Sequence, residues 1–298
     1  MTRTCAIVLN YFGAQKTKMC LNSLVGQAVD SIYIVDNSAS QAEADILSRL
    51  VEEISAIHES PFIRLLFNDD NLGFGKAMNR ALRHDIQNHG GHDFYILLNN
   101  DAQATPDMVK RLLARMQQEE DISLIAPKIS TDHGKTGFFW YNRLFGFITM
   151  EKRPFSFPFL TGCCLLFRRS LIEKEPLFDE DFFIYGEDAF LAWRLWSKGS
   201  RIVCADDIHV LHEGTGSSSH GGLFYEYHVA RGHILLATKT CENSYALPLF
   251  ILGRIFYLTT RALMRSLRYF SLAPIYAIFM CWFPLKIRNV CCRSNNNH

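Results

Sequence analysis

The sequence FYILLNND, residues 94–101, decides the fold. Its opening apolar run is typical of a strand that is buried on both faces, as in a parallel sheet covered by helices. Polar residues follow at once, from Asn99 to Asp101. Ligands bind beyond the carboxyl ends of the strands in open sheets of this kind, so we expect a ligand at this position.

The same pattern recurs along the first half of the chain. Helical patterns separate apolar runs that are predicted to form strands at Thr4–Tyr11, Ser31–Val35, Ile63–Phe67 and Ile122–Ala126. This alternation predicts an α/β protein with a mostly parallel sheet and helices on both faces. Polar residues again follow the strands, at Asn10, at Asp36 and from Asn68 to Asp70. We therefore expect one ligand site built from several strand ends.

Later segments carry further predictions of local structure. Thr105-Pro106 is typical of a helix start, with threonine as the N-cap and proline at the first helical position. Residues 128–160 are rich in glycine and aromatic residues but weakly periodic, which predicts a loop region. Beyond them we expect a helix at Glu187–Ser197 and strands at Phe159–Phe167, Arg201–Cys204 and Ile208–Leu211.

The composition is that of a globular protein with a basic end. The chain has 298 residues and is 48% hydrophobic, which excludes a disordered chain and a polycation that coats nucleic acid. Seven basic and no acidic residues follow Pro248, whereas the preceding 247 residues carry an excess of six acidic ones. The nine cysteines are scattered without a C-x-x-C pair, so we expect free thiols in a reducing cytosol.

The basic end predicts a membrane contact. On a helical wheel Arg254, Arg261, Arg265 and Arg268 fall within an arc of about 60°, surrounded by apolar residues. This pattern favours a helix that lies in a membrane interface. A helix pair docked on the body or a partner, and a span by Tyr269–Leu285, are the alternatives. The aromatic surroundings favour lipid over nucleic acid. We expect a catalytic domain over residues 1–240 and a membrane-association tail over residues 241–298.

A glycine-containing motif follows the third predicted strand. The sequence NLGFGKAMN from Asn71 to Asn79 resembles a phosphate-binding loop that enters a helix, with Gly73 at the turn. Met78 stands where the dinucleotide fingerprint has its third glycine, and the chain has no Walker sequence. A Rossmann dehydrogenase and a P-loop enzyme are therefore disfavoured.

Three further positions carry acids or a histidine that can bind a cation or transfer a proton. Asn99 and Asp101 lie on one side of a strand end, where a carboxylate can bind a divalent cation, although a plain turn would use the same residues. Asp188 follows aromatic residues and can act as a general base with a raised pKa, although acids also favour the first turn of a helix. His212 follows the last strand and is either a ligand or a structural histidine.

Taken in order, the motifs resemble inverting nucleotide-sugar glycosyltransferases of the GT-A fold, sequence family 2. They are most similar to the rhamnosyltransferase-type enzymes of bacterial surface polysaccharide (O-antigen) assembly. The resemblance extends from about Thr4 to Ser218. The residues that carry it are Val8–Tyr11 (VLNY), Val35–Ser38 (VDNS), Asn71–Asn79, Leu98–Asp101 (LNND), Thr161-Gly162, Gly186–Asp188 (GED), Trp193-Arg194 and His212.

The resemblance implies a role for each matching residue. Asp188 would be the catalytic base, and Asp101 would hold Mg²⁺ or Mn²⁺ on the donor diphosphate together with His212. Asn99 stands where many members have the first acid of the Asp-x-Asp motif, which puts metal dependence in doubt. The remaining donor-binding residues implied are Asn10, Asp36, Asn71, Gly73, Asn79 and Arg194.

The resemblance also implies the reaction partners. The donor would be a dTDP- or UDP-sugar, with rhamnose as the sugar, and the acceptor a glycan on a lipid. The protein would work at the cytoplasmic face of the inner membrane. The alternatives are a catalytically inactive scaffold of a membrane polysaccharide-assembly complex and a sugar-nucleotide pyrophosphorylase. The latter needs a glycine-rich loop after the first strand, where this chain has only NYFGA from Asn10 to Ala14.

Overall fold

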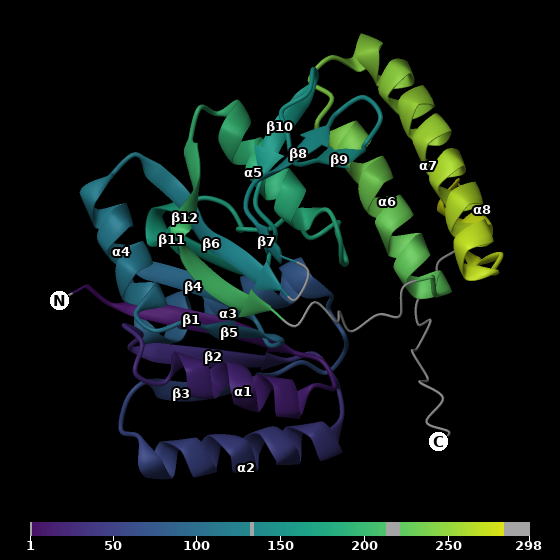
Figure 1. The fold of residues 1–298 in the computed structure, drawn as a ribbon. Helices are drawn as coiled ribbons and strands as arrows, with labels where there is room; N and C mark the ends of the chain where they lie inside the picture. Colours follow the sequence, from purple (N-terminus) through teal and green to yellow (C-terminus); the bar gives the residue numbers. More distant parts are fainter. Residues whose placement is uncertain (1, 132–133, 213–220, 283–298) are drawn as a thin grey trace.

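The computed structural model describes residues 2–131, 134–212 and 221–282 of the chain (Figure 1). Its first part alternates strands and helices, as the sequence predicted. The elements in order are β1 (Thr4–Asn10), α1 (Ala14–Leu24), β2 (Ser31–Asp36), α2 (Gln41–Ile57), β3 (Phe62–Phe67), α3 (Phe74–His89) and β4 (Phe94–Asn99).

These strands form one side of a nine-stranded sheet with the order β3-β2-β1-β4-β11-β6-β12-β5, and β7 pairs with β6. Strands β1 to β4 are parallel, with Asn10 beside Asp36 and Leu9 beside Asn99. The polar residues at the strand ends therefore meet at one edge. The expected α/β fold with a mostly parallel sheet is confirmed.

The second part of the sheet includes antiparallel strands. Its elements are β5 (Ala102–Ala104), α4 (Met108–Gln118), β6 (Ile122–Thr131), β7 (Gly134–Thr136), β11 (Cys164–Arg168), η1 (Arg169–Leu171) and β12 (Arg201–His212). Strand β11 runs antiparallel between β4 and β6. The two short strands predicted after residue 200 are one strand, whose pairing with β6 shifts between Ala205 and His209.

The predicted helix start at Thr105 is wrong. Helix α4 begins at Met108, after Asp107 in a left-handed conformation with φ of 57°. The Thr105 hydroxyl donates to the carbonyl of His209 at 2.6 Å in place of capping a helix. The Thr105 side chain, which the local sequence predicted to cap a helix, is thus used in a long-range hydrogen bond to β12.

The predicted loop at residues 128–160 is also wrong, because it contains a second sheet. Its strands are β8 (Phe139–Asn142), β9 (Ile148–Thr149) and β10 (Ser156–Phe159), too short for periodicity to reveal. The rings of Tyr141 and Phe157 are buried against Trp193 of helix α5 (Glu187–Ser197). This small sheet extends the core beyond the main sheet.

Apolar side chains cover both faces of the main sheet. One cluster joins it to α1, α2 and α4, and includes Leu21, Leu47 and Leu112. The other joins it to α3 and α5, and includes Met78 and Leu191. The described cysteines are free, as expected, and most are buried. Cys291 and Cys292 lie outside the described residues.

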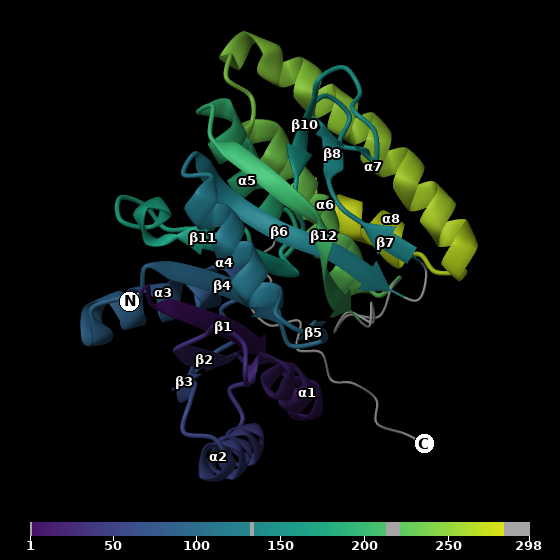
Figure 2. The ribbon, with the colours of Figure 1, turned by 60° about the vertical axis from the view of Figure 1, so that its left-hand side comes forward.

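Three helices and a short turn complete the described chain. They are α6 (Leu223–Lys239), η2 (Ser244–Ala246), α7 (Leu247–Tyr269) and α8 (Ala273–Trp282). Figures 1 and 2 show α7 along the outer side of α6, on the part of the molecule away from α2. Helix α6 packs against both α7 and α8. The predicted domain over residues 1–240 and the predicted tail thus share an interface.

Three of the four arginines on this face of α7 point into the protein, so the predicted contact with lipid headgroups is wrong for Arg254, Arg261 and Arg265, whereas Arg268 is exposed. Arg254 is fully buried and donates to the carbonyls of His233 and Arg143 at 3.0 and 2.9 Å. Arg261 and Arg265 form ion pairs with Glu226 of α6 at 2.7 and 2.6 Å. The polar face of this helix is therefore docked on the body of the protein, which is the alternative that the sequence left open.

Candidate active site

The carboxyl edge of the sheet carries a carboxylate and an imidazole in contact. Asp101 follows β4, and β5 pairs with β12 so that Ala102 lies beside His212. The Nε2 atom of His212 lies 3.1 Å from Oδ1 of Asp101, and both side chains remain partly open. A carboxylate oxygen and an imidazole nitrogen suit Mn²⁺ and, through the oxygen, Mg²⁺. The two residues therefore fit the cation that the sequence implied.

Asp36 is held in place by its neighbours at the end of β2. Its Oδ1 accepts hydrogen bonds from Asn10 Nδ2 at 2.9 Å and from Ser38 Oγ at 2.7 Å. Asn10 is fully buried, and its amide also donates to Glu43 Oε1 at 3.0 Å. The Asn10 amide thus positions Asp36, and a place for Asn10 in the nucleoside pocket stays a prediction.

The glycine motif is packed against another segment. The backbone N–H of Phe74 donates to the carbonyl of Phe183 at 2.8 Å. Gly73 has φ of 78°, and a Cβ there would lie 2.1 Å from the same carbonyl oxygen. Asn71 accepts from the N–H of Gly73 at 2.9 Å and closes the turn. These contacts close the turn against the Phe183 backbone, and the donor-binding roles of Asn71 and Gly73 stay predictions.

Asn79 and Arg194 contact the segment of chain that precedes Glu187 and Asp188. Asn79 is buried and exchanges two hydrogen bonds with the backbone of Phe178, at 2.8 and 3.1 Å. Arg194 donates to the carbonyls of Pro176 and Leu177 at 3.0 and 2.7 Å. Both side chains hold the backbone of residues 176–178, and their donor-binding roles stay predictions.

Asp188 lies in the first turn of α5, after a turn with two positive φ angles, 69° at Tyr185 and 102° at Gly186. Its Oδ2 accepts from the N–H of Gly162 at 3.1 Å. The next residue, Cys163, accepts from the N–H of Asn99 at 2.9 Å. Asp188 is thus linked through two residues to the end of β4, where the loop to Asp101 begins. Backbone strain of this kind gathers at functional sites.

The two adjacent acids both have raised pKa values. Burial raises the pKa of Glu187 to about 8, and the neighbouring Asp188 carboxylate adds to the effect. Burial also raises the pKa of Asp188, against the hydrogen bonds from Ala189 and Gly162. With a pKa of about 8, Glu187 is mainly protonated at neutral pH. Sequence reasoning singled out Asp188 and missed Glu187, whose only signal was its place beside the other acid.

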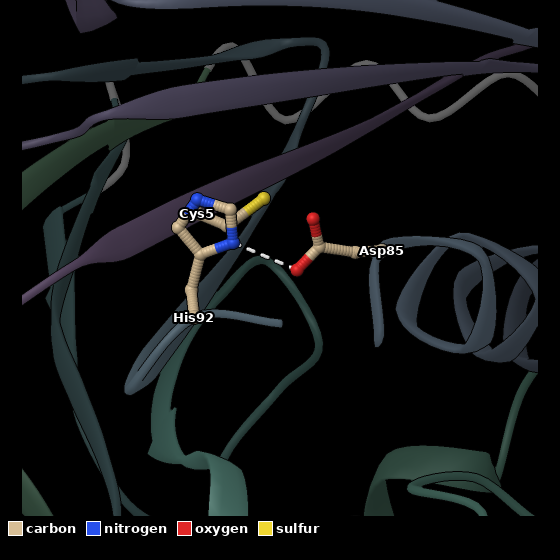
Figure 3. A group of neighbouring side chains, drawn as sticks. All are labelled: Cys5, Asp85 and His92. Carbon is tan, nitrogen blue, oxygen red and sulfur yellow. Dashed lines mark hydrogen bonds and ion pairs between the residues drawn. The ribbon is translucent and has the colours of Figure 1, made fainter. Parts of the chain in front are cut away.

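Figure 3 shows a second cluster of potential ligand side chains, which lies near the starts of β1 and β4. Cys5, Asp85 and His92 bring potential ligand atoms within 4.8 Å of one another. His92 Nδ1 lies 2.7 Å from Asp85 Oδ2, and the Tyr95 hydroxyl donates to the same oxygen at 2.8 Å. Burial raises the pKa of Cys5 well above its ordinary value, so it stays a thiol. Asp85 serves here as a buried hydrogen-bond acceptor that ties α3 to β4.

The arrangement defines a class of enzyme. A mostly parallel sheet with Asp101 and His212 at its carboxyl edge, and Asp188 at the start of a following helix, is that of a GT-A glycosyltransferase. Residues 5–175 match the model of Glycosyl transferase family 2. The match exceeds half of the chain, and the chain belongs to this family.

Curated relatives point to polysaccharide synthesis. The chain is 26% identical over 225 residues to N-acetylglucosaminyl-diphospho-decaprenol L-rhamnosyltransferase of Mycobacterium tuberculosis, covering 66% of this chain and 70% of the relative. It is 27% identical over 150 residues to the O-antigen biosynthesis protein RfbC of Myxococcus xanthus, covering 42% of this chain and 11% of that protein. The protein is a rhamnosyltransferase-like glycosyltransferase.

Solved structures share the fold. The mannosyltransferase PcManGT from Pyrobaculum calidifontis, in complex with GDP-Man and Mn²⁺, superposes with a TM-score of 0.59 at 15% identity over 95% of this chain and 87% of the other. GalNAc-T7 with UDP, GalNAc and Mn²⁺ gives 0.60 at 11% identity over 85% and 54%. Both neighbours carry Mn²⁺.

Proposed function

We propose that the protein transfers rhamnose from a dTDP- or UDP-linked donor, with inversion, to a sugar carried on a polyprenyl diphosphate. The observation that carries this proposal is the link from Asp188 through Gly162 and Cys163 to Asn99, beside Asp101. This link supports a pairing of Asp188, as the base, with Asp101, as the group that would hold the donor diphosphate. The acceptor named for the mycobacterial relative supports the lipid-linked part.

Asp188 performs the proton transfer in this proposal. Its carboxylate takes the proton of an acceptor hydroxyl while that oxygen attacks the anomeric carbon. The bond between this carbon and the donor diphosphate breaks on the opposite face, and the nucleoside diphosphate leaves. The raised pKa of Asp188 improves its match to a hydroxyl proton. Asp36, fixed by Asn10, is the proposed contact to the nucleoside.

Asp101 and His212 are the proposed ligands of a divalent cation. A bound Mg²⁺ or Mn²⁺ offsets the negative charge on the departing diphosphate. Asn99 contributes an amide where a second carboxylate would bind more strongly. Weak metal affinity is therefore part of the proposal.

The proposed location is the cytoplasmic face of the inner membrane, with α7 and α8 in its surface. The part of the chain that the structure describes contains one helix long and apolar enough to cross a membrane, Ser244–Tyr269. A crossing would separate Arg254 from its backbone acceptors, so we favour a helix that lies on the surface. The apolar side chains that face solvent include Leu252, Phe256, Leu263, Leu267, Phe270, Leu272 and Phe279.

A transfer assay with full-length protein tests the catalytic proposal. dTDP-rhamnose and UDP-rhamnose are offered with a short-chain prenyl diphosphate N-acetylglucosamine, and the product's anomeric configuration is determined by NMR. We expect transfer with one donor, inverted configuration and stimulation by Mn²⁺. In parallel, the melting temperature is measured with UDP, dTDP, GDP and NAD, each with and without Mn²⁺.

Asp101→Ala sharpens the same assay. We expect the rise in melting temperature that the donor nucleotide causes in Mn²⁺ to be at least tenfold smaller than in wild type. The reason is that the Asp101 carboxylate would hold the cation that binds the diphosphate. Glu52→Ala, at an exposed position of α2, is the control. Nucleotide binding that is the same with and without Mn²⁺, and the same in wild type and Asp101→Ala, would contradict the metal site. A response to NAD alone would contradict the donor class.

A further inference from the structure

A pocket beside Asp188 is not explained by donor binding. It has a volume of about 320 Å³, near the lower end of the about 300–1,000 Å³ typical of small-molecule sites. It lies between the small sheet, the start of α5 and helix α6. Its lining residues include Phe139, Tyr141, Ile148, Phe159, Thr161, Tyr185, Glu187, Asp188, Tyr225, Val229 and Leu236. The wall is mainly apolar and aromatic, with the base at one side.

Two polar atoms of this pocket have no partner among the described residues. They are Oε2 of Glu187 and Oγ1 of Thr161, and both atoms are buried. Glu187 as a whole is 6% exposed. A buried polar atom without a hydrogen bond costs about 1–3 kcal/mol, so a ligand that supplies the missing partners gains affinity. The other polar side chains of the wall are engaged: the Tyr141 hydroxyl lies 2.7 Å from His233 Nδ1.

We propose that this pocket binds the acetamido group of an N-acetylhexosamine acceptor, with Glu187 donating to its carbonyl oxygen and Thr161 accepting from its N–H. The inference rests on the proposed transfer to a lipid-linked sugar and names the part of the acceptor that is recognised. The acetamido methyl group lies among the aromatic side chains. The sugar ring is then next to Asp188, which takes the proton from a hydroxyl.

The charge state of Glu187 supports this assignment. Its pKa of about 8 keeps a proton on the carboxyl group at neutral pH, so the group can donate to a carbonyl. Asp188 already accepts the N–H of Ala189 at 2.7 Å at the helix start. A second charge at the adjacent position would repel the first, and Glu187 is the more deeply buried of the two.

A polyprenyl chain suits this pocket less well than an acetamido group. An alkene chain would satisfy the aromatic wall but leave Glu187 and Thr161 without hydrogen-bond partners. A hexose hydroxyl could both accept and donate here, but it would place no methyl group against the aromatic side chains. An acetamido group offers one acceptor, one donor and one methyl group, which matches all three features.

The test compares two acceptors that differ only at this group: N-acetylglucosamine and glucose, each on the same short-chain prenyl diphosphate. We expect the wild-type protein to prefer the N-acetylglucosamine acceptor at least tenfold in kcat/KM. Glu187→Leu should raise the KM for that acceptor at least tenfold and leave the donor KM unchanged. Glu187→Gln, which keeps a hydrogen-bond donor, should stay within about threefold of wild type.

Thr161→Val provides a second variant. It should also raise the KM for the N-acetylglucosamine acceptor, but by less than Glu187→Leu. Glu52→Leu on α2 is the matched control, and melting temperatures verify that each variant folds. Equal use of the two acceptors by the wild-type protein would overturn the inference. So would a Glu187→Gln variant as impaired as Glu187→Leu, because that result would require a carboxyl group rather than a donor.

A binding measurement separates this inference from the proposed function. The N-acetylglucosamine and glucose lipids are titrated into wild type and Glu187→Leu by calorimetry without donor. Selective binding that Glu187→Leu abolishes supports the pocket even if no transfer is detected, which would count against the function alone. Transfer that proceeds with equal binding of both lipids would retain the function and reject the pocket assignment.

Discussion

Two buried carboxyl groups on opposite sides of the molecule behave in opposite ways. Asp85 is fully buried, and Glu187 is 6% exposed. Burial pushes the pKa of each upward, but hydrogen bonds from His92 and Tyr95 hold that of Asp85 below its ordinary value. Glu187 receives no such side-chain bond among the described residues, and its pKa rises to about 8.

The difference shows that partners, rather than burial, separate a structural acid from a functional one. The Oδ2 of Asp85 is occupied by donors of its own chain, which fixes the loop between α3 and β4. Glu187 and Asp188 stand at a strained turn beside a pocket, and Oε2 of Glu187 has no hydrogen-bond partner in the part of the chain that the structure describes. Protein groups complete the first site, whereas in our proposal a ligand completes the second.

The largest effect is expected from Asp188→Asn. Removing the base should lower kcat by about 10²–10⁴-fold, the usual contribution of general base catalysis. Binding of the donor nucleotide should remain within about twofold, because the asparagine still accepts from Gly162. Transfer kinetics measure the first quantity and thermal shift the second. Near-normal turnover would show that another group takes the proton.

Asp85→Asn provides the counterpart at the other end of the sheet. Its kcat at 20 °C should equal that of wild type, since the cluster with Cys5 and His92 touches no reacting group. An Asp85→Asn protein that folds but has lost turnover would break the distinction between the two carboxyl groups.

Gly232→Ala is expected to lower kcat by about tenfold or more, because a small misplacement of a catalytic group has large effects. A Cβ at this position of α6 would lie 2.3 Å from the carbonyl oxygen of Tyr185. The methyl group must push the turn that presents Asp188. Ala230→Ser, at a buried neighbouring position on the same helix, is the control. Unchanged kcat in Gly232→Ala would show that the turn tolerates displacement.

The sequence was sufficient to predict the sheet and the acids at its edge. Runs such as Phe94–Leu98 are buried on both faces, so their apolar pattern is independent of the details of packing. Asp36, Asp101 and Asp188 follow elements that are recognisable locally. The small sheet at residues 139–159 could not be found in this way, since strands of four residues or fewer give no usable period.

Contacts at long range in the sequence are the feature that local patterns could not predict. Asn79 bonds to Phe178, which lies 99 residues further on, and Arg261 pairs with Glu226, 35 residues before it. A helical wheel places arginines on one face but does not say whether a carboxylate or a lipid headgroup lies opposite. Only the fold supplies the partner.

The two carboxyl groups should also differ in how they affect stability with pH. The lowered pKa of Asp85 means that its stabilisation is present above its unfolded pKa and is lost as the pH falls. The raised pKa of Glu187 means that the folded protein loses stability as the pH rises from about 4.5 to about 8. The two groups thus act in opposite directions.

The directions of the two pKa shifts predict how substitutions at Asp85 and Glu187 change stability. At pH 8, Asp85→Asn should lower the free energy of unfolding by about 1–3 kcal/mol, through loss of buried hydrogen bonds. Glu187→Gln should raise the melting temperature at pH 8.5 relative to wild type, with a smaller gain at pH 5. Melting curves at the two pH values measure both. A Glu187→Gln protein that is less stable at pH 8.5 would show that the carboxylate form is the native one.

The smallest effect concerns the outer face of α7, the counterpart of its buried arginine face. Leu267 and Phe270 are 77% and 97% exposed. If each inserts partly into a bilayer, exchange for serine should cost about 1 kcal/mol, or about fivefold in partition to anionic vesicles. Ile57→Ser, 77% exposed on α2, is the matched control.

Point substitutions on this face are more informative than truncation before α7. Truncation would leave Glu226 of α6 buried without Arg261 and Arg265, so a loss of binding would be confounded with a loss of folding. The serine variants keep these pairs intact. Sedimentation with vesicles that is weakened by Leu267→Ser and Phe270→Ser, but not by Ile57→Ser, would assign membrane contact to the apolar face. Equal sedimentation of all three would place the contact elsewhere.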